Sequence, residues 1–148
     1  MSTKTQTLIP SLSVNGGAAA IDFYKRAFGA KELHRLEGEA GKIAHAELEL
    51  NGSVLMLADE YPEWGFVGPK TLGGSPCTLT LYVDDVDAFA DRACAAGAVV
   101  ERPASDEFYG DRVARLRDPF GHRWSIHTRK ETLTEAQIRE RFAKLSSG

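Results

Sequence analysis

Residues 78–86 read Thr-Leu-Thr-Leu-Tyr-Val-Asp-Asp-Val, and this stretch combines the signals of a strand and of a helix start. Apolar and polar side chains alternate up to Val83, which is the period of a half-buried strand. Asp84 and Asp85 follow, and aspartate is a favoured residue at the N-cap of a helix. The stretch therefore predicts a strand that runs directly into a helix.

The same pattern occurs earlier in the chain at a constant displacement. Residues 8–14, Leu-Ile-Pro-Ser-Leu-Ser-Val, alternate in the same way and precede a stretch with helical periodicity. Three pairs of matching residues lie 69 positions apart, namely Val14 with Val83, Gly41 with Gly110, and Gly52 with Gly121. Such internal repetition indicates two copies of one supersecondary unit.

Each copy continues with a helix and three further strands. Gly29 and Gly97 are natural helix ends, and Asn51-Gly52 is a strong hairpin signal whose counterpart is the turn at residues 118–121. The expected strands cover residues 31–38, 43–50 and 53–58 in the first copy, and 99–102, 112–117 and 123–128 in the second. The unit is therefore βαβββ, and the fold class is α+β.

The 148 residues suit a single domain. We expect module 1 at about 7–58, a connecting loop at 59–76 and module 2 at about 77–128. A capping box between Thr134 and Gln137 predicts a C-terminal helix over about 134–145.

Composition argues against several classes of protein. Hydrophobic residues make up 43% and charged residues 26%, as in an average globular protein, and the net charge of −3 gives no reason to expect a nucleic-acid partner. No apolar stretch has the length of a membrane span or a signal peptide, so we expect no membrane partner and a cytoplasmic location. Cys77 and Cys94 lack the spacing of a zinc or disulfide motif and are expected to be buried thiols.

The repeated βαβββ order resembles the vicinal oxygen chelate superfamily of glyoxalases, bleomycin-resistance proteins and extradiol dioxygenases. The resemblance covers residues 8–128 and is carried by residues 9–14, 20–25 and 81–86. The motifs Tyr109-Gly-Asp-Arg112 and Asp118-Pro-Phe-Gly-His-Arg-Trp124 look like the PhnB-like branch.

In that superfamily each module supplies two metal ligands, one from its first strand and one from its last. Counting from Val14 and Val83, the four ligand positions fall on Ile9, Met56, Thr78 and Ser125. None is a histidine or carboxylate, and a divalent ion needs imidazole, carboxylate or thiolate ligands. We therefore expect no metal and no other cofactor at the family site.

Strand alternation predicts which side chains face the cleft and which face the helices. Ala44 and the apolar residues in phase with it are expected against the helices. The side chains expected in the cleft form a mixed polar and apolar set that suits a ligand pocket: Ile9, Ser11, Ser13, Ile43, His45, Glu47, Met56, Thr78, Thr80, Tyr82, Val113, Arg115, Ser125 and His127.

Three groups of residues could do more than line a cleft. His45, Glu47 and His127 could hold a metal elsewhere or act as general acid and base. The plainer interpretation, which we favour, is a solvated strand face for His45 and Glu47 and a strand end near the module exit for His127. Arg112 and Arg115 could bind a carboxylate or phosphate of a ligand, or form internal ion pairs. Four aromatic residues could stack on a flat ligand, or simply pack in a core or dimer: Trp64, Phe66, Phe108 and Tyr109.

These features favour a metal-free protein that binds a small organic molecule, with the cavity assembled in a homodimer. The alternative is an enzyme of lyase, isomerase or dioxygenase type, metal-dependent or acting by acid-base chemistry, with an unconventional site at His45, Glu47 and His127.

Overall fold

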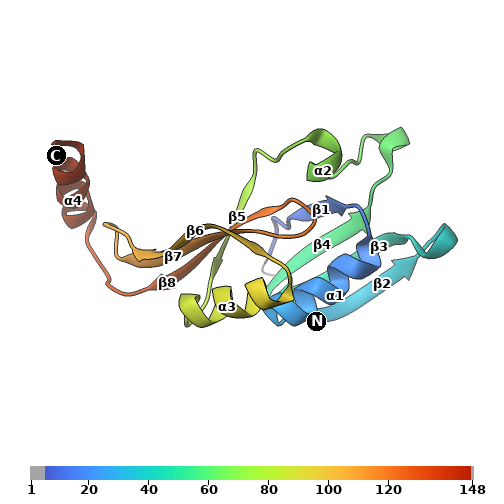
Figure 1. Ribbon diagram of the computed structural model, residues 1–148, viewed down its shortest axis with the longest axis horizontal. Coiled ribbons are helices and arrows are strands. Elements are labelled where there is room, and N and C mark those ends of the chain that lie inside the picture. Colours follow the sequence, from blue (N-terminus) through green and yellow to red (C-terminus); the bar gives the residue numbers. More distant parts are fainter. Residues whose placement is uncertain (1–5, 148) are drawn as a thin grey trace.

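The computed structural model describes residues 6–147, and its first half is one βαβββ module (Figure 1). Four strands form a sheet in the order β1-β4-β3-β2, with β1 and β4 parallel and the other pairs antiparallel. The elements are β1 (Ser11–Val14), α1 (Gly17–Phe28), β2 (Lys31–Glu37), the 3-10 turn η1 (Glu39–Gly41), β3 (Ile43–Leu50) and β4 (Ser53–Asp59).

The second half repeats this arrangement. Its sheet has the order β5-β8-β7-β6, again with one parallel pair, β5 and β8. The elements are β5 (Thr78–Tyr82), α3 (Val86–Ala96), β6 (Val99–Asp106), β7 (Asp111–Arg117) and β8 (Arg123–Arg129). The segment between the modules contains η2 (Pro62–Trp64) and α2 (Pro69–Leu72), and α4 (Glu135–Ser147) lies at the far end of the molecule.

The register of the parallel strands confirms the repeat. Ser11 pairs with Met56 in module 1, and Thr80 pairs with Ser125 in module 2, so both partners shift by the same 69 positions. The predicted α+β fold of two βαβββ modules with a C-terminal helix is therefore confirmed. Within residues 6–147, no helix is both long enough and apolar enough to cross a lipid bilayer.

The helix caps that the sequence predicts are present in the structure. The Asp85 carboxylate accepts a hydrogen bond from the Ala88 amide at 3.1 Å and caps α3. Gly29 ends α1 in the left-handed conformation, which glycine adopts without strain. The capping box at the start of α4 is present, since the Thr134 amide donates to Gln137 Oε1 at 2.8 Å and the Gln137 amide donates to Thr134 Oγ1 at 3.1 Å.

The expected sides of Ile43 and Ala44 are wrong. Ile43 is fully buried beside Gly17 of α1, whereas Ala44 is exposed. The ladder between β2 and β3 skips Ala44, so a bulge reverses the alternation at this end of β3. Asp59 holds the bulged strand, because its carboxylate accepts hydrogen bonds from the Ile43 amide at 2.7 Å and from the Gly17 amide at 2.9 Å.

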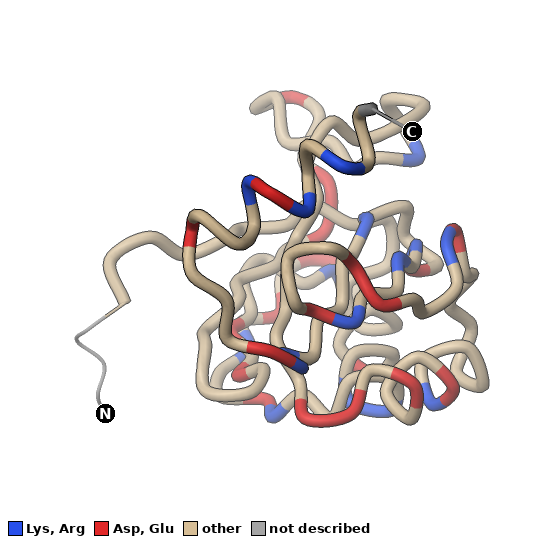
Figure 2. Tube along the Cα trace, turned by 90° about the vertical axis from the view of Figure 1, so that its left-hand side faces the viewer, with Lys and Arg blue, Asp and Glu red and all other residues tan. Residues whose placement is uncertain are grey.

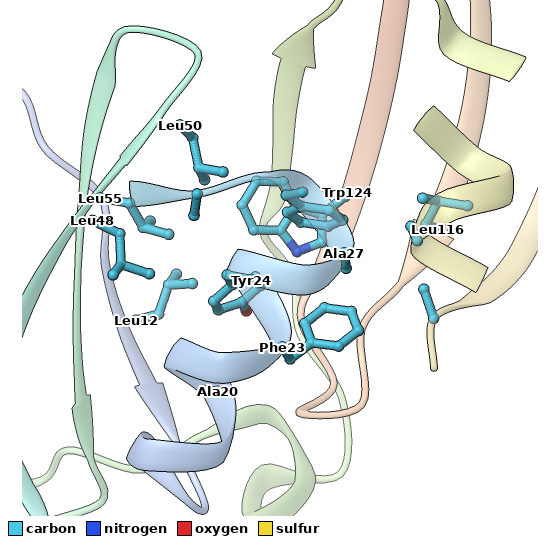
Figure 3. Packing of buried hydrophobic residues seen from close by; sticks show 14 of the residues in the cluster. Leu12, Ala20, Phe23, Tyr24, Ala27, Leu48, Leu50, Leu55, Leu116 and Trp124 are labelled. Atoms are coloured by element: carbon cyan, nitrogen blue, oxygen red, sulfur yellow. The ribbon is translucent and has the colours of Figure 1, made fainter. Parts of the chain in front are cut away.

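One hydrophobic core joins the two modules. α1 and α3 lie side by side, and the Phe28 ring stacks on Phe89 with centroids 5.1 Å apart. Trp124, on β8 of module 2, packs against Phe28 of module 1 with ring centroids 4.9 Å apart. It also packs against Tyr24 at 5.8 Å (Figure 3). Burying such large apolar surfaces is the main favourable term in folding, so each module depends on the other for part of its core.

A buried carboxylate lies at the centre of this shared core. Asp118 accepts hydrogen bonds from the Tyr24 hydroxyl, from Trp124 Nε1 at 2.9 Å, and from the amides of Phe120 at 2.9 Å and His122 at 3.0 Å. Burial and the neighbouring charge of Asp118 raise the pKa of Tyr24, so its hydroxyl stays protonated and donates. The carboxylate therefore fixes the β7–β8 turn and the helix of the other module together.

Replacing Asp118 by alanine should destabilise the protein strongly. Four donors would lose their acceptor, the Tyr24 and Trp124 donors inside the core, and a single unsatisfied buried donor costs about 1–3 kcal/mol. We expect Asp118→Ala to lower the free energy of unfolding by more than about 3 kcal/mol in urea denaturation. Asp22→Ala is the matched control, because Asp22 is exposed and its pair with Arg26 is worth less than about 1 kcal/mol. Equal losses in the two variants would contradict this role.

Candidate functional site

The sheet face of module 2 that is turned away from α3 carries an unusual set of side chains, and we call it the open face. It consists of Thr78, Thr80, Tyr82, Asp111, Val113, Arg115, Ser125, His127 and Arg129. Ser125 and His127 lie on the central strand β8 and are only 4% and 8% exposed, although both are polar. A buried polar group is costly unless it is hydrogen-bonded, so their partners matter.

Ser125, His127 and Asp111 form a continuous line of hydrogen bonds. His127 Nδ1 lies 2.9 Å from Asp111 Oδ2, and His127 Nε2 lies 2.9 Å from Ser125 Oγ. A carboxylate only accepts, so Nδ1 carries the hydrogen and Nε2 of the neutral imidazole is free to accept the Ser125 hydroxyl proton. The register of β7 on β8 produces this line, because it sets Asp111 opposite Arg129 and Val113 opposite His127.

Asp111 is held as a charged carboxylate although it is 3% exposed. Burial by itself would raise the pKa of Asp111, but hydrogen bonds from the Tyr82 hydroxyl at 2.6 Å and from His127 outweigh it, with help from the positive charge of Arg129. The net effect is a pKa below the usual range. An ionised acceptor therefore anchors the line at neutral pH.

A cavity opens beside the anchored end of this line. Its volume is about 250 Å³, and its walls include Tyr82, Tyr109, Asp111 and Arg129. Leu133, just before α4, and Ile138, in the first turn of α4, also line it. The rings of Tyr82 and Tyr109 lie 5.1 and 6.3 Å from the His127 ring, so aromatic surface and hydrogen-bonding groups converge here.

The two arginines of β7 differ in what they contact. Arg112 lies on the other face, where it donates to the Asp87 carboxylate of α3 at 2.8 and 3.2 Å and to Asp106 at 3.1 Å. The internal ion pair that the sequence left open is thus present at Arg112. Arg115 is exposed on the open face directly opposite Ser125, and its side chain has no hydrogen-bond or ion-pair partner among residues 6–147.

Arg115 lies near enough to Tyr109 for its charge to matter. Burial chiefly, and then the negative charges of Glu107 and Asp111, raise the pKa of Tyr109, and the positive charge of Arg115 opposes them. Arg115 does not line the cavity itself, but its guanidinium has no internal side-chain partner and is suited to an anionic group on a ligand that reaches the open face.

The corresponding face of module 1 carries different chemistry. His45 Nε2 lies 3.0 Å from Glu47 Oε2, and both side chains are partly exposed on β3. These two residues belong to one sheet and His127 to the other, so the three do not gather on one face. Within the part of the chain that the structure describes, no three His, Cys, Asp or Glu residues group together to hold a metal.

The four positions that the resemblance assigns to metal ligands, Ile9, Met56, Thr78 and Ser125, are also poorly suited to bind a metal ion, and Ile9 offers no donor atom in its side chain. Met56 offers a thioether opposite Ser11, and Thr78 offers a neutral hydroxyl opposite Arg123. The Ser125 hydroxyl is already bonded to His127. Such a donor set does not suit a divalent ion, so no step of chemistry is assigned to a metal at these positions.

The other aromatic candidates lie away from this cavity. Trp64 and Phe66 are on the connecting segment and are exposed, with Trp64 stacked on Tyr61 at 5.5 Å between ring centroids. Phe108 packs against Phe142 of α4 at 5.4 Å. The sequence did not single out Asp111 and Arg129 as site residues, although alternation along β7 and β8 places them in phase with Arg115 and His127.

The family model for the Glyoxalase/Bleomycin resistance protein/Dioxygenase superfamily matches residues 7–126. A protein of Mycobacterium bovis, Mb0911c, is 43% identical over 143 residues, which cover 95% of this chain and 92% of that protein.

Solved structures share the fold. TioX from Micromonospora sp. ML1, whose crystal structure is known, is 29% identical in sequence and superposes with a TM-score of 0.67. The match covers 84% of this chain and 98% of the TioX chain. The X-ray structure of a gene product of Arabidopsis thaliana is 30% identical in sequence and has a TM-score of 0.68. The match covers 83% of this chain and 98% of that one. By the match to the family model and the duplicated sheet order, the chain belongs to the glyoxalase/bleomycin-resistance/dioxygenase superfamily.

Proposed function

We propose that this protein binds a small organic anion on the open face of module 2, and that binding needs no metal ion. The observation that carries the proposal is the exposed Arg115, which has no partner among residues 6–147 and lies across from Ser125. An exposed guanidinium with no internal side-chain partner is available to a ligand, and its planar fork suits a carboxylate or phosphate.

The shape of the site favours a ligand with a flat ring. Tyr82 and Tyr109 line the cavity of about 250 Å³, and tyrosines give large contact area at low entropic cost. The Arg129 guanidinium lies 5.4 Å from the centre of the Tyr82 ring and holds that ring in place. We also propose that Thr80, which pairs with Ser125, contacts the ligand, and that the motifs of module 2 place the chain in the PhnB-like branch.

Two other expectations belong to the same proposal. Basic and acidic side chains are interspersed along the trace (Figure 2), which favours a small ligand over nucleic acid. Cys77 and Cys94 are both free, which is consistent with a cytoplasmic location, but the expectation that they are buried is wrong, since Cys77 is exposed and Cys94 is partly exposed.

The probe for this proposal is 1-naphthoate, an aromatic carboxylate, measured by isothermal titration calorimetry. We expect Arg115→Gln to weaken binding about tenfold, the equivalent of one charge-assisted hydrogen bond lost at a partly solvated site. The neutral analogue 1-naphthalenemethanol should bind wild type and variant equally, because it has no charge for Arg115. Arg139→Gln, a change at an exposed arginine of α4, is the control. No binding by wild type, or equal binding of naphthoate by Arg115→Gln, would refute the proposal.

We further propose that the protein forms a homodimer. Leu33 and Leu36 on the edge strand β2, and Val99 and Val100 on the edge strand β6, are 42–52% exposed. Edge strands with exposed apolar side chains commonly pair with another chain.

Light scattering coupled to size-exclusion chromatography should give twice the mass of the 16.1 kDa chain. The double variant Leu36→Glu, Val100→Glu should shift the protein to the monomer, since it places charges on the proposed contact. A monomeric wild type at tens of micromolar would rule the dimer out.

A further inference from the structure

The hydrogen-bonded line on β8 has the connectivity of an activated nucleophile. The Ser125 hydroxyl lies 2.9 Å from His127 Nε2, and the opposite nitrogen of that ring is held at 2.9 Å by a buried carboxylate. This is the order of nucleophile, base and orienting acid that makes a serine hydroxyl reactive. All three residues are less than a tenth exposed, so water competes little for their hydrogen bonds.

The fold itself does not require these residues. Module 1 builds the same parallel strand pair, and the residues at the positions of Ser125 and His127 are Met56 and Ala58. Core polar groups add desolvation cost and must all be satisfied, whereas apolar ones need no partners. Because one copy of the module folds without the polar line, its presence in the other copy is explained by a use beyond stability.

Donors lie on both sides of the serine. Arg115 on β7 and Thr80 on β5 are each registered with Ser125, and both side chains are exposed on the open face. A guanidinium and a hydroxyl beside the attacking oxygen are suited to stabilise the negative charge that develops on a carbonyl oxygen during attack. Arg115 also suits the carboxylate that such a reaction releases.

We propose that Ser125 is a nucleophile that accepts the acyl group of a small ester and transfers it to water. The Ser125 Oγ–carbon bond forms as the Oγ proton moves to His127 Nε2, and the alcohol leaves with that proton. Water then attacks the acyl-serine, giving one proton to Nε2 and releasing the carboxylic acid as the proton returns to Ser125 Oγ. Asp111 is a positioning residue: its carboxylate accepts the Nδ1 hydrogen, which fixes the ring tautomer and aims Nε2 at Ser125. This inference rests on the proposed function in one respect, namely that the substrate binds on the open face of module 2.

The test is acylation by 4-nitrophenyl acetate, followed by release of 4-nitrophenol and by mass spectrometry of peptides. We expect one acetyl group on the peptide that contains Ser125. Ser125→Ala and His127→Ala should each lower the rate at least about a hundredfold, as expected when a nucleophile or general base is removed. Ser53→Ala, at an exposed serine of the β3–β4 hairpin, should keep the wild-type rate.

Two further variants separate reactivity from folding. Ser125→Cys keeps the size of the side chain and should still be acetylated, since a thiol is also a nucleophile. Asp111→Asn should lower the limiting acetylation rate more than about tenfold while the half-saturating ester concentration stays the same, which a general loss of structure would not produce.

The outcomes distinguish this inference from the binding proposal. Acetylation of lysines or of the N-terminus in place of Ser125, or an unchanged rate in Ser125→Ala, overturns the nucleophile. If naphthoate binding persists in that case, the binding proposal stands alone. If wild type neither binds naphthoate nor becomes acetylated, both fall together.

Discussion

The Asp118 carboxylate is the interaction on which the arrangement of the two modules depends. It ties a helix of module 1, through Tyr24, to a strand of module 2, through Trp124, while its remaining acceptor capacity closes the β7–β8 turn. The turn sets the register of β7 on β8, and that register brings Asp111 to His127. The candidate site thus depends on a contact in the core, on the opposite side of the sheet.

Duplication gave the chain two similar sheets that carry different chemistry. Where β7 and β8 pair Arg115 with Ser125, β3 and β4 pair Glu47 with Met56. Module 1 therefore presents a histidine–glutamate pair with partial solvent exposure, and module 2 presents a buried polar line with an exposed arginine. One module can keep the stability of the fold while the other takes on polar residues that cost stability, as functional sites commonly do.

Much of the architecture could be predicted because the repeat and the strand alternation are local signals. The constant displacement of Val14 and Val83 gave the βαβββ order, and alternation gave the side of most strand residues. The side of Ile43 could not be predicted, because the bulge depends on Asp59, which lies 16 positions further along the chain and ends β4 where the sequence predicts the start of the connecting loop. The role of Asp111 could not be predicted for the same reason, since its contact with His127 forms only when β7 lies beside β8.

The most direct measurement is a crystal structure of the protein with 1-naphthoate bound. The carboxylate should lie about 3 Å from the Arg115 guanidinium, above β5, β8 and β7, with the ring against Tyr82 or Tyr109. That position would place a product-like carboxylate beside Ser125 Oγ. Naphthoate found on module 1, or on the apolar side of α4 with Arg115 uncontacted, would contradict the assignment of the open face of module 2 as the binding site.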